Sequence, residues 1–183
     1  ISDWDSFILS EIQKYNPQII SFSCYVWNIK KILSLSLKLK KLYKNIKIIL
    51  GGPEVSPLAE IILEKNNQID FIVKGEGEVT FSELIKALIE TRDDFDKIPG
   101  ISYRINGKIV NNIDRMIIPD LDSIPSPYWD TSMLDNADRR EVCLETQRGC
   151  VFKCHFCYYN KSFKNIRFFS LERVRQDLSF LLK

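Results

Sequence analysis

Short apolar runs alternate with segments of helical period over the first 90 residues. Runs of this length that are dominated by apolar side chains are typical of buried strands. They cover residues 19–23, 46–50 and 70–73. The helical segments cover residues 4–15, about 28–44, the stretch after Ser56-Pro57, and a helix that opens with the capping-box residues Thr80-Phe81-Ser82-Glu83. Continuous apolar strands separated by amphipathic helices predict a parallel sheet with helices on both faces.

The hydrophobic pattern changes after Pro99. Residues 101–105 and 108–110 flank Asn106-Gly107, which is typical of a β-hairpin with a type I′ turn. Residues 112–140 contain several prolines and little periodicity, which predicts a linker laid along the surface. We then expect a strand at 142–146 and a final helix capped by Ser170. The apolar face of that helix contains Leu171, Val174, Leu178, Leu181 and Leu182.

The long helices of the first part have distinct apolar faces. In the helix over 28–44 the inward positions are expected to be Ile29, Ile32, Leu33, Leu39 and Leu42. In the helix that opens at Thr80 they are expected to be Phe81, Leu84, Ile85, Leu88 and Ile89. A run of lysines is interpreted as mostly solvated surface, because no aromatic residues are interleaved with it as in a nucleic-acid patch. The run consists of Lys30, Lys31, Lys38, Lys40 and Lys41.

Composition and charge exclude several classes of protein. The 183 residues include 26 basic and 24 acidic side chains, a net charge of +2, which excludes a basic nucleic-acid footprint over the whole surface. No apolar stretch approaches the roughly 20 residues that span a bilayer, so we expect no membrane span. The five cysteines are an odd number, and three are crowded into one segment. This favours a reducing, cytoplasmic compartment over a secreted disulfide framework.

The candidate chemistry is concentrated in residues 148–157, where Cys150, Cys154 and Cys157 are spaced four and three positions apart. Three thiolates on a short loop can bind three irons of a [4Fe-4S] cluster and leave the fourth iron open to a small molecule. Gly149 permits the backbone to turn close to such a cluster. Basic side chains nearby would offset its negative charge, namely Arg148, Lys153, Lys161, Lys164 and Arg167.

Two other interpretations of this segment stay open. A structural zinc site needs a fourth ligand, which His155 or Cys143 would have to provide, although His155 is badly placed beside Cys154. A redox pair of Cys154 and Cys157 is the second interpretation, but it leaves Cys150 without a role.

The CxxxCxxC pattern, with Arg148-Gly149 before it and Phe156 before the third cysteine, resembles the signature of radical S-adenosylmethionine (SAM) enzymes. This resemblance implies that the three cysteines hold a [4Fe-4S] cluster, that SAM chelates the fourth iron, and that Phe156 lies near the adenine. It also implies that one electron, from a donor such as flavodoxin or ferredoxin, cleaves SAM to a 5′-deoxyadenosyl radical that acts on a small-molecule substrate. Val151 departs from the proline that is common in such enzymes; that proline shapes the loop and binds no iron.

The first hundred residues resemble the cobalamin-binding domain that precedes the radical domain in one large subgroup. That subgroup includes anaerobic magnesium-protoporphyrin monomethyl ester cyclases and methyltransferases. In this domain, loops at the carboxyl ends of the parallel strands hold the nucleotide tail of cobalamin. The corresponding loops are Ser23-Cys24-Tyr25, Gly51-Gly52-Pro53 and Gly75-Glu76-Gly77, and the residues that the resemblance assigns to cobalamin are Ser23, Gly51, Gly52, Gly75 and Gly77. The pair of glycines would permit close approach of the backbone to the cofactor.

The sequence departs from that domain in two places. We expect a first strand and its loop, which often carry a cobalt-ligating histidine, to be absent, and the only histidine is His155 in the cysteine motif. Tyr25 also stands where a leucine is usual. The glycines have a second interpretation, as ordinary turn residues of a doubly wound sheet.

The remaining polar and aromatic candidates are expected to have structural roles. We expect small buried residues at Ser21, Ser23, Cys24 and Cys143. Glu76 and Glu78 would be either an acid and a base or, as we favour, stabilising charges at a helix N-terminus. Aromatic residues expected to pack or to line a cavity are Trp27, Trp129, Tyr158 and Tyr159.

Together these patterns predict an α/β protein. It would consist of a flavodoxin-like (Rossmann-type) domain over 1–95 without its first strand, a hairpin and linker over 96–140, and the beginning of a radical SAM (β/α) partial barrel over 141–183. The expected function is that of a radical SAM enzyme fragment that binds a [4Fe-4S] cluster and cobalamin. We expect no turnover from the chain alone, because such a barrel needs on the order of 200 residues. The alternative is a non-catalytic α/β binding module with a structural zinc loop.

Overall fold

The computed structural model describes residues 3–129, 142–152, 154–157, 159 and 165–182. The chain divides into two compact units, Ile1–Ile117 and Ile118–Lys183, and each is described by itself. Four residues named above lie outside the described residues: Lys153, Tyr158, Lys161 and Lys164.

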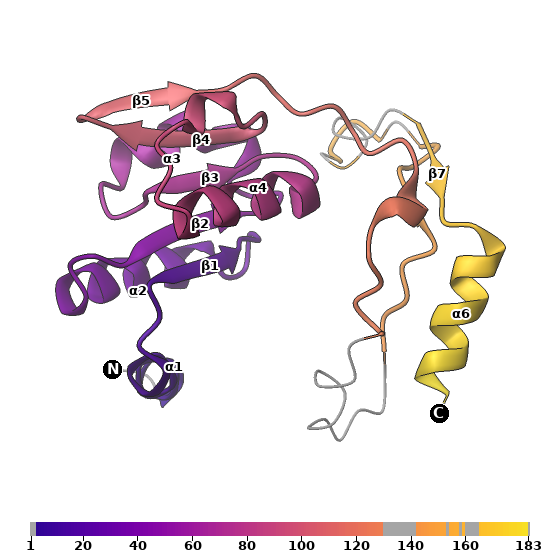
Figure 1. Cartoon of the computed structure of the whole chain (residues 1–183), viewed down its shortest axis with the longest axis horizontal. Helices are drawn as coiled ribbons and strands as arrows, with labels where there is room; N and C mark the ends of the chain where they lie inside the picture. Colours follow the sequence, from indigo (N-terminus) through magenta and orange to yellow (C-terminus); the bar gives the residue numbers. More distant parts are fainter. Residues whose placement is uncertain (1–2, 130–141, 153, 158, 160–164, 183) are drawn as a thin grey trace. The chain divides into compact units, whose positions relative to one another are not determined.

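The first unit is a flavodoxin-like α/β domain built on a five-stranded sheet in the order β1-β2-β3-β4-β5 (Figure 1). Its elements are α1 (Asp3–Tyr15), β1 (Ile19–Ser23), α2 (Ile29–Leu42), β2 (Lys47–Gly51), η1 (Ser56–Leu58), α3 (Ala59–Lys65), β3 (Phe71–Val73), α4 (Gly77–Ile89), η2 (Phe95–Lys97), β4 (Ile101–Ile105) and β5 (Lys108–Asn111). Strands β1, β2 and β3 are parallel, and β4 and β5 extend the sheet in antiparallel pairing. The predicted hairpin is confirmed: Asn106 and Gly107 have φ values of 49° and 76°, as a type I′ turn requires.

Hydrophobic residues cover both faces of this sheet, as the continuous apolar strands predict. One core joins the sheet to α2 and α3 through Leu35, Leu39 and Leu63, and α1 packs against it. The other core joins the sheet to α4 through Leu84. Neighbouring residues of β2 belong to opposite cores, Ile48 to the first and Ile49 to the second, because successive side chains of a strand alternate between faces.

Helix α4 begins at Gly77, three residues before the predicted capping box. Thr80 is buried inside the helix, where its hydroxyl donates to the carbonyl oxygen of Pro99 (3.2 Å) and accepts from Nε of Arg115 (2.7 Å). These distant partners satisfy the hydroxyl that the capping interpretation assigned to the helix N-terminus. The predicted burial of Leu42 and Ile89 is also wrong, since their side chains are 62% and 71% exposed.

The lysine run, expected to be mostly solvated, includes one partly buried member, Lys40. Its ammonium group lies 2.7 Å from Oδ2 of Asp70 and donates to the carbonyl oxygen of Ile46 (2.6 Å). The same carboxylate oxygen accepts from the backbone N–H of Ile48 at 2.7 Å. Lys40 therefore ties α2 to the amino ends of β2 and β3.

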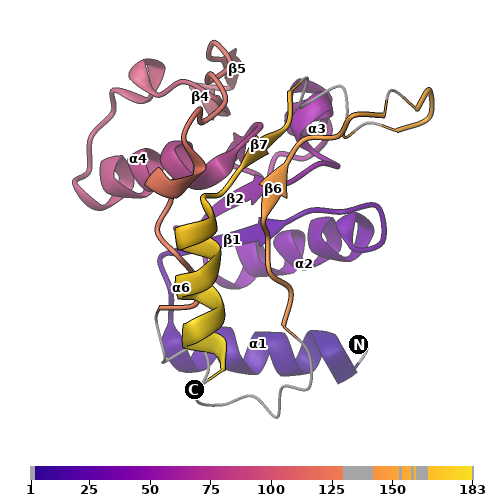
Figure 2. The ribbon, with the colours of Figure 1, turned by 90° about the vertical axis from the view of Figure 1, so that its right-hand side faces the viewer.

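The second unit contains η3 (Leu121–Ser123), β6 (Gln147–Arg148), β7 (Arg167–Phe168) and α6 (Leu171–Leu181). The short strands β6 and β7 pair in antiparallel fashion, and α6 follows β7 (Figure 2). The strand predicted at 142–146 is wrong, because those residues form no strand and β6 begins at Gln147. The Ser170 cap is confirmed, since its hydroxyl accepts from the backbone N–H of Arg173 at 3.1 Å.

The buried face of α6 differs from the predicted leucine stripe. Leu171 and Leu182 are more than four-fifths exposed, whereas Arg173 and Asp177 are buried and form an ion pair of 3.1 Å. The hydroxyl of Ser126 donates to Asp177 (2.7 Å), and Arg173 donates to the carbonyl oxygen of Ile124 (2.8 Å). Part of the predicted surface linker is therefore packed against α6 through a polar core.

Candidate functional site

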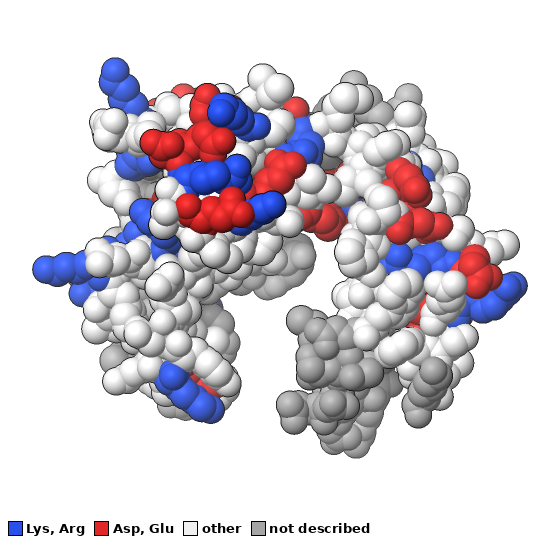
Figure 3. All heavy atoms as spheres, in the orientation of Figure 1, with Lys and Arg blue, Asp and Glu red and all other residues white. Residues whose placement is uncertain are grey.

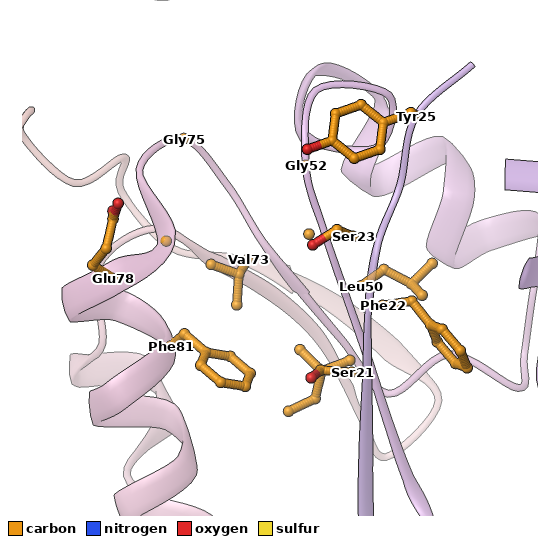
Figure 4. A pocket seen from close by; sticks show the side chains of 13 residues that line it. Ser21, Phe22, Ser23, Tyr25, Leu50, Gly52, Val73, Gly75, Glu78 and Phe81 are labelled. Atoms are coloured by element: carbon orange, nitrogen blue, oxygen red, sulfur yellow. The ribbon is translucent and has the colours of Figure 1, made fainter. Parts of the chain in front are cut away.

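Three loops meet at the carboxyl ends of β1, β2 and β3, because parallel strands end at the same edge of a sheet. They enclose a cavity of about 490 Å³ (Figure 4). All five residues predicted at this edge line it, namely Ser23, Gly51, Gly52, Gly75 and Gly77. The other lining residues are Ser21, Phe22, Tyr25, Ile49, Leu50, Val73, Glu78 and Phe81. A mostly apolar lining with a few polar groups is typical of a small-molecule site.

The serines of β1 face this cavity. Ser21 and Ser23 are exposed and two positions apart, so their side chains point to the same side of the strand. The prediction that they are small buried residues is therefore wrong. Their hydroxyls are available to a ligand as donors and acceptors.

The close approach expected at the Gly-Gly pair occurs within the protein itself. A Cβ atom on Gly52 would lie 2.7 Å from the carbonyl oxygen and 2.9 Å from the nitrogen of Cys24, and the φ of Gly52 is 101°. Hydrogen bonds from Cys24 N–H to the Gly51 carbonyl (2.7 Å) and from Glu54 N–H to the Cys24 carbonyl (3.2 Å) join the same two loops. Gly52 is thus required by loop packing, which favours the interpretation as a turn residue at this position.

The remaining glycines leave more room. A Cβ atom on Gly51 or Gly77 would make only ordinary contacts with Val73, at 3.5 Å or more, and one on Gly75 would meet nothing within 4 Å. The absent side chains of Gly51 and Gly77 therefore leave space beside the cavity. A substitution at Gly77 tests the site with less risk to the fold than one at Gly52.

Two titratable candidates next to the cavity have different environments. Cys24 is fully buried, as predicted, and burial raises the pKa of its thiol from 9.0 to about 11, so it is a neutral thiol at pH 7. Glu78 lies in the first turn of α4 and lines the cavity, whereas Glu76 is the N-cap residue and does not line it. The position of both carboxylates agrees with the predicted charges at a helix N-terminus.

The loop between β1 and α2 carries residues whose role the sequence does not indicate. The rings of Tyr25 and Trp27 are stacked, with centroids 4.6 Å apart and an interplanar angle of 4°. Trp27 is 74% exposed and does not line the cavity, and its ring packs on that of Tyr25. Asn28 bridges the loop: its Oδ1 accepts from Tyr25 N–H (2.8 Å), and its Nδ2 donates to the Ser23 carbonyl (3.0 Å). Sequence reasoning missed Asn28, although an asparagine between a strand and a helix is a common loop-fixing residue.

The three cysteines of the CxxxCxxC motif lie in the second unit. Cys154 is exposed, Cys150 and Cys157 are partly buried, and none of the three forms a disulfide. The N–H of Cys157 donates to the Cys154 carbonyl at 3.1 Å, which turns the chain between them. Within the described ranges, the structure arranges no group of three or more His, Cys, Asp or Glu side chains to hold a metal ion. Cys143 is exposed, which contradicts its predicted burial.

The backbone before the first cysteine is held by other parts of the second unit. Gly149 has a φ of 105°, and a Cβ atom there would overlap the backbone of Asn165. Its N–H donates to the hydroxyl of Tyr159 at 3.0 Å. Two of the predicted charge-balancing cations have protein partners: Arg148 pairs with Glu145 at 3.0 Å, and Arg167 donates to the Ile118 carbonyl.

On the face drawn in Figure 3, acidic and basic side chains are interspersed over the first unit. No helix among the residues the structure describes combines the length and the apolar character needed to cross a membrane.

Residues 4–85 match the B12 binding domain family. Over 180 residues the chain is 34% identical to "Uncharacterized methyltransferase PH0819" of Pyrococcus horikoshii, covering 96% of this chain and 39% of that protein. It is 28% identical to the cobalamin-dependent radical SAM methyltransferase TokK of Streptomyces tokunonensis, covering 97% of this chain and 28% of TokK. It is 32% identical to the anaerobic magnesium-protoporphyrin IX monomethyl ester cyclase of Synechocystis, covering 84% of this chain and 32% of that enzyme.

Solved structures share the fold. The cobalamin-dependent SAM radical enzyme OxsB, with aqua-cobalamin and SAM bound, matches with a TM-score of 0.75 and 24% identity, over 96% of this chain and 25% of OxsB. The radical SAM methyltransferase TsrM of Kitasatospora setae matches with a TM-score of 0.67 and 17% identity, over 97% of this chain and 37% of TsrM. The chain thus spans well under half the length of these proteins.

Proposed function

Because this chain is related to cobalamin-dependent radical SAM enzymes and carries a B12 binding domain over residues 4–85, we propose that the cavity of the first unit holds the nucleotide end of cobalamin. One observation carries the proposal. The five residues expected to contact cobalamin, which come from three separate loops, line a single cavity at the carboxyl edge of the sheet. This edge is where ligands bind in open α/β sheets.

The residues present fit that part of the cofactor. The cavity of about 490 Å³ lies in the range of sites that enclose a small molecule. Leu50, Val73 and Phe81 offer apolar contact to a planar base, and the hydroxyls of Ser21 and Ser23 offer hydrogen bonds. Bound cobalamin would supply the cobalt chemistry of the enzyme. Residues 4–85 contain no histidine, so their contribution is to bind and orient the nucleotide end.

A substitution at Gly77 tests this site. A leucine there would begin from a Cβ atom in ordinary contact with Val73 and would fill part of the cavity. We expect Gly77→Leu to weaken cobalamin binding at least about tenfold, as an obstructed pocket should, while the protein stays folded by circular dichroism. Gly107→Asn, in the hairpin turn where nothing lies within 4 Å, is the control and should bind as the parent does. If Gly77→Leu binds cobalamin as tightly as the parent in equilibrium dialysis, the proposal that cobalamin occupies this cavity is refuted.

The second part of the proposal concerns the cysteine motif. Cys150, Cys154 and Cys157 would hold a [4Fe-4S] cluster, with SAM at the open iron and Phe156 beside the adenine. The cluster would supply one electron, received from a donor such as flavodoxin or ferredoxin, for reductive cleavage of SAM to methionine and a 5′-deoxyadenosyl radical. Three cysteines at this spacing, none of them in a disulfide, are a donor set for such a cluster. Because metal binding and local folding are coupled, the thiolates would converge as the cluster binds.

Anaerobic reconstitution with iron and sulfide tests the cysteine motif. We expect a broad absorption band at about 400 nm, which thiolate-bound clusters of this type show. Cys150→Ala, Cys154→Ala and Cys157→Ala should each abolish it, whereas Cys143→Ala, at an exposed cysteine outside the motif, should not. Stoichiometric zinc without iron would instead support the alternative of a binding module with a structural zinc loop. The reaction of the whole protein, methyl transfer or ring formation on a small-molecule substrate, belongs to the same proposal.

A further inference from the structure

Tyr25 and Trp27 form a stacked aromatic pair at the surface. Both rings lie on the loop between β1 and α2, and their exposed fractions are 37% and 74%. Nearly parallel rings with centroids 4.6 Å apart form a flat and rigid surface. Tyr25 lines the cavity (Figure 4), whereas Trp27 does not. Of the two stacked rings, the one that lines the cavity is therefore that of Tyr25.

Asn28 fixes the backbone that carries this pair. Its carboxamide accepts from the N–H of Tyr25 at 2.8 Å and donates to the carbonyl of Ser23 at 3.0 Å. The N–H groups of Asn28 and Ile29 both donate to the Tyr25 carbonyl, at 3.1 and 3.0 Å. The two backbone hydrogen bonds of Cys24 tie the same loop to the loop after β2. The position of the Tyr25 ring is thus set before a ligand arrives, which reduces the entropy lost on binding.

The chemistry of the lining indicates which part of a ligand faces this ring. Among the described residues that line the cavity, the only charged side chain is Glu78. A carboxylate disfavours a phosphate or a carboxylate as its neighbour. A neutral planar heterocycle suits the apolar and aromatic walls, and stacking on an aromatic side chain stabilises a bound base.

We infer that Trp27 and Asn28 are positioning residues that hold the Tyr25 ring against the aromatic base at the nucleotide end of cobalamin, and so select corrinoids that carry such a base. This inference rests on the proposed function. It goes beyond it by assigning a role to two residues that do not line the cavity. The selectivity arises because the Tyr25 ring contacts the base and no other part of the corrinoid.

The test compares two ligands, cobalamin and cobinamide, the second of which lacks the nucleotide and its base. We expect Trp27→Ala and Asn28→Ala to weaken cobalamin binding about tenfold, the scale of one lost stacking contact, and to change cobinamide binding by less than about twofold. Trp27→Phe keeps an aromatic ring and should restore most of the cobalamin affinity. Val26→Ala is the matched control, because Val26 is 72% exposed on the same loop and takes no part in the stack.

The outcomes separate this inference from the proposed function. Parental cobalamin affinity in Trp27→Ala and Asn28→Ala, or an equal loss for both corrinoids, overturns the inference and leaves the cavity as a cobalamin site. Failure of the parent protein to bind cobalamin overturns both. If cobinamide binds the parent too weakly to measure, the test uses cobalamin alone. A loss of cobalamin affinity in Trp27→Ala that is absent in Val26→Ala and Trp27→Phe, with unchanged thermal unfolding, then supports the inference. The same loss in all three variants overturns it.

Discussion

The Gly51-Gly52 pair offers a sharp test of how the cavity is built, because the same substitution should destabilise the protein at Gly52 and have little effect at Gly51. In Gly52→Ala the new Cβ atom would lie 2.7 and 2.9 Å from backbone atoms of Cys24, and the φ of 101° is unfavourable for any side chain. The left-handed backbone costs about 1–2 kcal/mol, and relief of the overlap by a backbone shift adds about 1–3 kcal/mol. The free energy of unfolding should therefore fall by about 2–5 kcal/mol.

Gly51→Ala supplies the comparison one residue away. Its Cβ atom would make contacts of 3.7 and 3.9 Å with Val73, which are ordinary van der Waals distances. Its free energy of unfolding should stay within about 1 kcal/mol of the parent value. Urea unfolding followed by circular dichroism measures both variants. Equal midpoints for Gly51→Ala and Gly52→Ala would refute the view that Gly52 is required by the backbone of Cys24.

Three further predictions concern buried and titratable groups. Burial raises the pKa of Cys24 from 9.0 to about 11, so iodoacetamide at pH 8 should modify the exposed Cys143 and spare Cys24, as mass spectrometry can show. The stability that the protonated Cys24 thiol contributes should be lost as pH rises from about 9 to about 11. Asp177→Ala leaves Arg173 buried without its ion-pair partner and should destabilise the second unit by about 3–5 kcal/mol; a parental proteolysis pattern at α6 would contradict this. Hydrogen bonds from Ser170, the N-cap residue of α6, lower the pKa of Asp122 below 3.8. The stability that the Asp122 carboxylate contributes should therefore be present above pH 3.8 and be lost as pH falls through the pKa of this group in the folded protein. An Asp122→Asn variant should lack that component in an acid-unfolding titration.

The sequence alone determined the parts of this protein that depend on local pattern. Runs of apolar residues place β1, β2 and β3 to within one residue, because strands of a parallel sheet with helices on both faces are mostly apolar rather than alternating. Asn106-Gly107 determines the hairpin, since few other residues adopt both positive φ values. The loops after the three parallel strands could be assigned to one edge of the sheet because the strand direction is fixed by the intervening helices. Their lining of a single cavity follows from that rule.

Tertiary contacts decided the features that involve distant partners. Helix α4 begins at Gly77, and Thr80 lies inside it with its hydroxyl satisfied by Pro99 and Arg115, partners that no local pattern shows. Arg173 is buried in α6 because Asp177 and the Ile124 carbonyl satisfy its guanidinium group, so polar partners outweigh the helical hydrophobic pattern there.

In the candidate site, too, some residues could be identified from the sequence and others only from the fold. Sequence spacing identified the glycines, but only the fold shows that Gly52 faces the backbone of Cys24 while Gly51 and Gly77 leave space beside the cavity. The stack of Tyr25 on Trp27 and the bridge made by Asn28 also depend on the three-dimensional course of the loop. Hydrophobic period is a property of neighbouring residues and can be recognised in one segment. Close backbone approach and hydrogen bonding to distant carbonyls are determined only when separate segments pack together, because each partner is supplied by a different part of the chain.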